Sequence, residues 1–185
     1  ARWAVFFDHL GIIYLYEPEG FDLPSGPYLP DFKLILRRWT RFLPEKEIWF
    51  EVKGKGPSPQ ERALCSELAE ATGDPAYLFH GSFSQRSDRW DDVDFPAGLV
   101  FHPWGEENED QRWCRCPRCK SFDIVFRGWT DQMVCRQSGG ACSEEKGRSA
   151  VPGAVILEAA HLARTFRFVS FDTCETPSPR EAREP

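Results

Sequence analysis

The segment SPQERALCSELAEATG constrains the fold of this chain most strongly, because both ends of a helix are marked in it. Ser58 is a typical N-cap, Pro59 suits the first helical position, and Glu61 can complete a capping box. Gly73 is typical of the residue just past the end of a helix. The runs KEIWFEVK before this segment and AYLFHGS after it are short, apolar and rich in aromatic residues, as buried strands are. The sequence therefore predicts a capped helix between two strands.

Further helices and strands are predicted on both sides of this unit. Apolar residues recur at helical spacing in two segments, 2–10 and 153–168. Runs rich in β-branched and aromatic residues predict strands within three more segments, 11–23, 25–39 and 97–104. Because helices and strands follow one another along the chain, we expect an α/β fold in which helices flank a central mixed sheet.

The length and composition are those of a folded globular protein. The 185 residues are enough for one buried domain, or for one domain and a small appendage. No stretch approaches the roughly 20 apolar residues that cross a bilayer, so we expect a cytoplasmic protein with no membrane association. The chain opens on an apolar run without a Met, which suggests that residues precede Ala1. The net charge of -6 gives no overall basic surface for nucleic acid, although the stretch 33–41 is locally basic.

Two acidic residues and a lysine predict a metal site in the first half of the chain. Side chains alternate faces along a strand, so Glu51 and Lys53 lie on one face of the run KEIWFEVK. Asp31 begins the preceding strand, and if the two strands pair, Asp31 and Glu51 can converge on one cation. Carboxylate oxygens suit Mg²⁺, which activates water for phosphodiester hydrolysis, and Lys53 can orient that water or stabilise developing charge.

A structural explanation of the same residues is the alternative. Glu51 and Lys53 could form an exposed pair on an edge strand, and Asp31 could merely begin a turn after Pro30. The Pro-Asp pair about 20 residues upstream, the apolar strand around Glu51 and the capped helix that follows favour the metal site.

The segments YLPDF and WFEVKGKGPSPQERALCSELAEATGDPAYLFHG resemble the PD-(D/E)xK nuclease superfamily, in the small Vsr-like or Holliday-resolvase-like form of phage and mobile elements. The resemblance covers residues 1–82 and implies a restriction-endonuclease-like core. It implies Asp31 and Glu51 as Mg²⁺ or Mn²⁺ ligands, Lys53 as the catalytic lysine, and Gln60 as a polar residue facing the site. The implied function is a metal-dependent endonuclease that hydrolyses DNA phosphodiester bonds. The protein could also act as a homodimer, because enzymes that cut both strands of DNA often do.

A cysteine-rich stretch in the second half predicts a zinc ribbon. Five of the seven cysteines are clustered there, and without a secretory signal such clustering favours a metal over disulfides. Four thiolates at the ends of an aromatic hairpin can hold one structural Zn²⁺. The predicted ligands are Cys116, Cys119, Cys135 and Cys142. Cys114 competes with Cys116 for this role, His102 is a spare candidate, and a ribbon that has lost its metal is the alternative.

The predicted division of the chain follows from these motifs. It comprises a nuclease-like core (1–104), an acidic linker (105–112), a zinc ribbon (113–148), a C-terminal helix (151–170) and a disordered tail (171–185). Trp113 and Trp129, with several arginines nearby, would give the ribbon a basic, aromatic surface suited to nucleic acid.

One departure from the resemblance favours a second function. Members of this kind often carry a further metal-binding Glu on the first helix, and the segment ARWAVFFD has none. Glu17 or Glu19 could supply a carboxylate, although both suit a turn. The alternative function is therefore a catalytically inactive nuclease-fold module that binds nucleic acid or a protein partner through its zinc ribbon.

Overall fold

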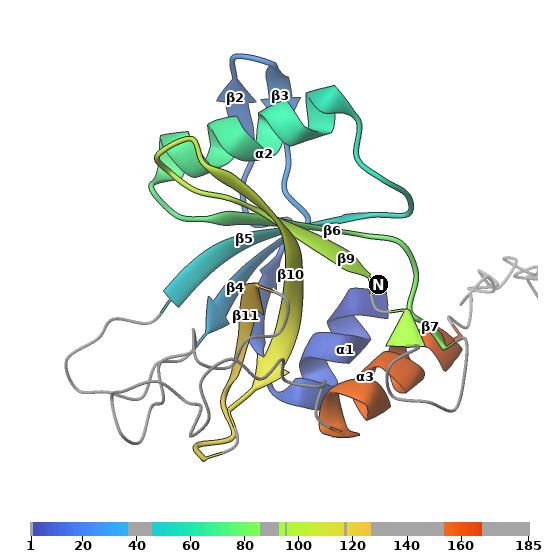
Figure 1. Ribbon diagram of the computed structural model, residues 1–185. Helices are drawn as coiled ribbons and strands as arrows, with labels where there is room; N and C mark the ends of the chain where they lie inside the picture. The colour runs from blue at the N-terminus through green and yellow to red at the C-terminus, as the bar shows by residue number, and fades with distance from the viewer. Residues whose placement is uncertain are drawn as a thin grey trace, which may run out of the picture.

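The computed structural model describes residues 2–36, 46–85, 93–94, 96–116, 118–126 and 154–167, which are drawn in colour in Figure 1. Within these residues the chain forms an α/β fold with three helices and a mixed sheet of seven strands. The α/β class and the central mixed sheet predicted from the sequence are thus confirmed. None of the helices in the described part of the chain is long and apolar enough to cross a membrane.

The strands of the large sheet lie in the order β1-β4-β5-β6-β9-β10-β11. Their bounds are β1 Ile13–Tyr16, β4 Phe32–Leu36, β5 Lys46–Lys53, β6 Ala76–His80, β9 Ala97–Phe101, β10 Glu107–Arg115 and β11 Phe122–Phe126. Strands β5 and β6 are parallel, and the other neighbouring pairs of this sheet are antiparallel.

Helix α2 (Pro59–Thr72) makes the crossover that the parallel pair β5 and β6 requires. Its ends are those expected from the sequence. The Ser58 and Glu61 side chains form a complete capping box, and Gly73 ends the helix with a φ of 75°, a conformation that glycine adopts without strain.

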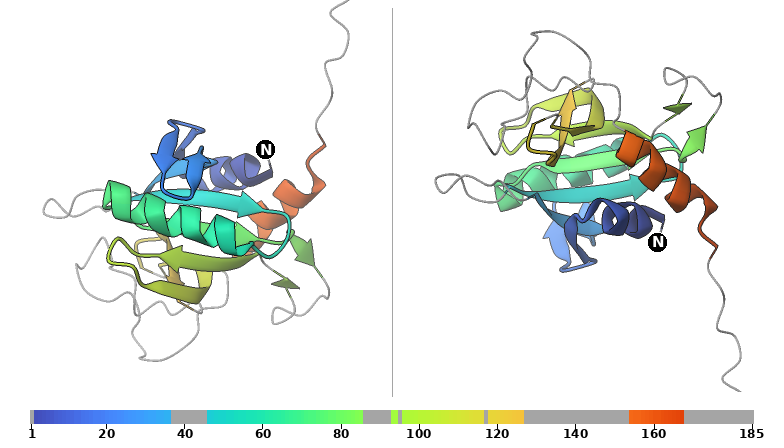
Figure 2. Two further views of the ribbon diagram at one scale, coloured as in Figure 1. Left: turned by 90° about the horizontal axis from the view of Figure 1, so that it is seen from above. Right: turned by 90° about the horizontal axis from the view of Figure 1, so that it is seen from below.

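The helices cover the two faces of the sheet unequally. Helices α1 (Arg2–Leu10) and α3 (Ala154–Thr165) lie against one face and α2 against the other, as Figure 2 shows. Alternation along β5 divides its side chains between the two sides. Ile48 and Phe50 join the aromatic core under α1, whereas Trp49 packs in the cluster under α2. Because Glu51 follows the alternation of Trp49, its carboxylate is on the α2 side.

A short hairpin of β2 (Phe21–Leu23) and β3 (Gly26–Tyr28) packs against α2. Its turn is tied to the helix by Ser25, whose amide and hydroxyl donate to the Glu67 carboxylate at 2.9 and 2.6 Å. The hairpin also brings Tyr28 to Cys65 of α2. A second small hairpin pairs β7 (Ser84–Gln85) with β8 (Val93–Asp94).

The predicted acidic linker, 105–112, is not a linker for most of its length. Residues Glu107–Arg115 form β10, which pairs with β9 and carries β11 at the edge of the central sheet. The Arg62 guanidinium of α2 forms ion pairs with Glu107 and with Glu109, the latter at 3.3 Å. The sequence did not predict this strand because its acidic side chains are exposed and resemble those of a linker. They lie opposite Arg62, whereas Gln111 and Trp113 of the same strand point inward.

The first part of the predicted zinc ribbon therefore belongs to the central sheet, and a separate ribbon is not seen in the described residues. Trp113 corrects a second expectation. It is 1% exposed and packs against Phe6, Phe7 and Phe50, so it is part of the core and not of a binding surface. Alternation along β10 accounts for this placement, because Gln111 and Trp113 lie on its buried face.

Some sequence predictions fall outside the described residues. They concern the ribbon beyond Phe126, with Cys135, Cys142 and Trp129, and the tail 171–185. Helix α3, in contrast, lies within the segment 151–170 predicted to be helical, and it packs on the same core as α1.

Candidate active site

The pairing of β4 with β5 brings Asp31 beside Glu51. Phe32 and Phe50 are direct partners in this antiparallel pair, so the residue before Phe32 lies opposite the residue after Phe50. Two hydrogen bonds join the start of β4 to the end of β5, each from a backbone amide of one strand to a carboxylate of the other. The Asp31 amide donates to Glu51 Oε2 at 3.1 Å, and the Val52 amide donates to Asp31 Oδ2 at 2.8 Å. The two carboxylates predicted to converge are thus adjacent and held by the strand backbones.

Burial makes it energetically unfavourable for both of these carboxylates to be charged. Glu51 is 5% exposed, and Asp31 is half-buried. Burial, and then the negative charge of Glu51, raises the pKa of Asp31 above its usual range, and the Val52 hydrogen bond offsets only part of this rise. The site therefore favours a positive charge that would compensate both carboxylates.

Lys53 supplies one positive charge to the site. Its Nζ lies 2.7 Å from Glu51 Oε1 and 3.5 Å from Glu61 Oε1. Burial opposes the charged form of Lys53, but its hydrogen bond to Glu51 and the surrounding carboxylates outweigh burial and raise its pKa. Lys53 is therefore an ammonium donor at neutral pH.

Glu61 is held beside Lys53 by the capping box of α2. Its Oε2 accepts from the Ser58 amide at 2.7 Å and from the Ser58 hydroxyl at 2.8 Å. These hydrogen bonds lower the pKa of Glu61, and the nearby Lys53 lowers it further. The sequence identified Glu61 as a cap but gave no sign that it approaches Lys53.

Tyr28 and Cys65 make a contact near Glu51 that the sequence did not predict. The Tyr28 hydroxyl and Cys65 Sγ are 3.4 Å apart. Burial, followed by Cys65 and Glu51, raises the pKa of Tyr28, and burial raises the pKa of Cys65 to about 12. Both groups therefore keep their protons at neutral pH, so Tyr28 can donate toward the Glu51 side of the site. No local sequence signal announces this contact, because it depends on the β2–β3 hairpin folding onto α2.

Gln60, the remaining predicted site residue, is the second residue of α2 and is exposed. The described contact between this turn of α2 and the site is made by its neighbour Glu61, through Lys53. The role proposed for Gln60 stays a prediction.

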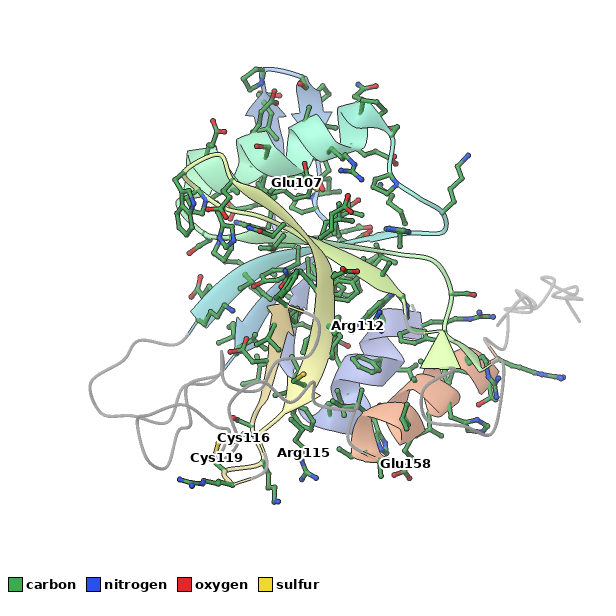
Figure 3. The ribbon with its side chains drawn as sticks, viewed as in Figure 1. Glu107, Arg112, Arg115, Cys116, Cys119 and Glu158 are labelled. Atoms are coloured by element: carbon green, nitrogen blue, oxygen red, sulfur yellow. The ribbon has the colours of Figure 1, made fainter. Side chains whose placement is uncertain are left out.

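The two predicted zinc ligands that are described lie in a tight turn between β10 and β11, at the end of β10 away from Glu107 (Figure 3). The Cys119 amide points at Cys116 Sγ, at 3.4 Å. The Cys116 amide donates to the Ser121 carbonyl at 2.8 Å, and Lys120 has a positive φ of 60°. A backbone amide directed at a cysteine sulfur favours the thiolate, which is the form that binds metal.

The competing zinc candidates differ from this pair. Cys114 is 1% exposed within β10, and burial raises its pKa to about 12, so its thiol stays protonated. His102 stacks on Trp104 with a ring separation of 4.4 Å, and burial lowers its pKa. Cys116 is equally buried, at 0% exposed, and the feature that sets it apart is the Cys119 amide directed at its sulfur. In the described part of the chain, no three His, Cys, Asp or Glu side chains are grouped to hold a metal ion.

The donor chemistry at Asp31 and Glu51 fits a hard divalent cation. Mg²⁺ commonly binds through one or two protein carboxylates and completes its shell with water and phosphate. Two adjacent carboxylates, one of them with a raised pKa, provide such a partial shell. Comparison of the chain with protein-family models and with curated protein sequences gave no match.

Proposed function

We propose that this protein is a metal-dependent endonuclease of the PD-(D/E)xK type that hydrolyses DNA phosphodiester bonds. The observation that carries the proposal is the crossed pair of hydrogen bonds that fixes Asp31 and Glu51 side by side, with the Lys53 ammonium in contact. A mixed sheet with α2 crossing directly after Lys53 is compatible with a restriction-endonuclease-like core.

Each of the three residues has a distinct task in the proposed reaction. Asp31 and Glu51 would hold Mg²⁺ or Mn²⁺, an ion that polarises a phosphoryl group and lowers the pKa of bound water. Lys53 would donate from its ammonium to the attacking water or to the charge that develops on phosphate. Burial of Glu51 excludes solvent from one side of the site, which strengthens these electrostatic contacts.

One observation favours a second candidate function, a catalytically inactive nuclease-fold module. Lys53 Nζ lies 2.7 Å from Glu51 Oε1, and this ion pair alone compensates part of the buried charge. A protein that used the fold only to bind nucleic acid or a protein partner would have no metal to hold, so the ion pair between Lys53 and Glu51 would stay formed.

A structural Zn²⁺ at the cysteine turn is a separate part of the proposal. It is supported by the Cys119 amide directed at Cys116 Sγ, and the other two proposed ligands are Cys135 and Cys142. Metal analysis of the purified protein should find one Zn²⁺ per chain, and Cys116→Ser should lose it. A zinc-free wild-type protein that is folded would refute this part.

The catalytic proposal is tested by cleavage of supercoiled plasmid and of branched DNA with Mg²⁺ or Mn²⁺. Lys53→Ala should reduce the rate by at least about a hundredfold, because it removes a group that stabilises charge in the transition state. Lys55→Ala is the matched control, since Lys55 is an exposed lysine in the loop just after β5 and should keep wild-type activity. Cleavage that survives Lys53→Ala would refute the assigned site. DNA binding without cleavage of either substrate would support the inactive module.

A further inference from the structure

We propose that Glu61 is a positioning residue that accepts the Lys53 ammonium when Glu51 turns to a divalent cation. The inference rests on the metal site of the proposed function and adds a residue that neither the motif nor the resemblance assigns. Its basis is that Lys53 lies between two carboxylates, at 2.7 Å from Glu51 and 3.5 Å from Glu61.

Lys53 and a cation would compete for the same oxygen. Glu51 Oε2 accepts from the Asp31 amide, so Oε1 is the oxygen more available to a metal, and Lys53 contacts that atom. A cation at Glu51 Oε1 would place two positive charges within a few ångströms of each other, which is strongly unfavourable in a partly buried site. The ammonium therefore needs a second acceptor nearby.

Glu61 is built to be that acceptor. Both Ser58 hydrogen bonds use its Oε2, and this role in capping explains the position of the carboxylate. Capping does not require Oε1, which faces Lys53. Because the carboxylate is anchored at the first turn of α2, a rotation of the Lys53 side chain is enough to exchange partners without moving the backbone.

Removing Glu61 should therefore leave Lys53 bound to Glu51 and weaken cation binding. Glu61→Gln is the suitable change, because Gln also completes a capping box and the fold is kept. We expect Mn²⁺ affinity, measured by calorimetry on the full chain without DNA, to fall about fivefold, a typical coupling between contacting side chains. Lys53→Met should raise the affinity, because the competitor is gone.

The double variant separates this mechanism from a general loss of negative charge. If Glu61 acts through Lys53, Glu61→Gln should change Mn²⁺ affinity less than twofold in the Lys53→Met background. Glu70→Gln, an exposed residue on the same helix, controls for net charge and should bind Mn²⁺ as the wild type does.

Three results would overturn the inference. They are an equal loss of affinity from Glu61→Gln in both backgrounds, an unchanged affinity in Glu61→Gln, and an absence of Mn²⁺ binding in every variant. The last would also remove the metal site of the proposed function, whereas the first two leave that function intact when the wild type cuts DNA. A coupled Glu61–Lys53 effect on Mn²⁺ without any DNA cleavage would support the inference and reject the nuclease.

Discussion

Replacing Gly98 by Ala should destabilise the protein sharply, because the sheet has no room for a side chain there. Gly98 lies in β9, paired with Phe79 of β6 and with Gln111 of β10. A methyl carbon on Gly98 would lie 2.6 Å from Phe79 Cζ, 2.8 Å from Phe79 Cε1 and 2.7 Å from the Gln111 carbonyl oxygen. Optimal contact between carbon atoms is about 3.5 to 4.0 Å, so both neighbours would have to move by about 1 Å.

Neither neighbour can move easily. Phe79 is fully buried, stacks on Phe50 with a ring separation of 5.0 Å and contacts Trp3 edge-on at 5.4 Å. The Gln111 oxygen belongs to the backbone, at an irregularity where the β9–β10 register shifts. Overpacking of this kind costs about 1 to 3 kcal/mol or more, and the lower unfolded-state entropy of Ala recovers about 0.4 to 1 kcal/mol.

The expected net loss is about 2 kcal/mol in the free energy of unfolding, or a fall in Tm of about 4 to 8 °C for a chain of this size. Urea and thermal unfolding followed by tryptophan fluorescence would measure it. Gly54→Ala is the control, because a methyl group at Gly54 has no atom within 4 Å. If Gly98→Ala is no less stable than Gly54→Ala, the close packing of β6, β9 and β10 is wrong.

Three other perturbations test separate parts of the structure. Asp123→Ala should cost about 3 kcal/mol in urea unfolding, because it leaves the partly buried Lys46 ammonium without the carboxylate that lies 3.1 Å away; a loss below about 0.5 kcal/mol would contradict this ion pair. Ser58→Ala should cost about 1 kcal/mol by removing the N-cap of α2, while Ser66→Ala in mid-helix should be nearly neutral in the same assay. Burial holds the pKa of His102 below its usual value of 6.5, so the unfolded chain takes up a proton first and stability falls as pH drops below about 6.5. Thermal unfolding between pH 7.5 and 5.5 should therefore show a shallower decline in His102→Gln, and identical slopes for the two proteins would exclude this contribution.

The elements predicted from the sequence were those with local signals. Helix α2 is announced by Ser58, Pro59, Glu61 and Gly73, each of which acts on the backbone within one turn of itself. The predicted neighbourhood of Asp31 and Glu51 also has a local origin. Two consecutive strands that pair as antiparallel neighbours bring the start of one beside the end of the other.

Two predictions made from local sequence signals were wrong. The acidic residues of 105–112 suggested a linker, yet Glu107 and Glu109 lie on a strand that pairs with β9, and Arg62 of α2 forms ion pairs with both of them. Trp113 looked like a surface aromatic, yet it fills the core against α1. Both the Arg62 ion pairs and the Trp113 contacts join segments that are far apart in sequence.

By itself, then, the sequence determined the α/β class, the capped helix and the pair of carboxylates that define the candidate site, because propensity, alternation and capping act over a few residues. Only the tertiary structure decided that β10 and β11 extend the central sheet, that Tyr28 contacts Cys65, and that Glu61 approaches Lys53. These features depend on long-range packing, in which burial of apolar surface and compensation of charge select one arrangement among many that the local pattern would allow.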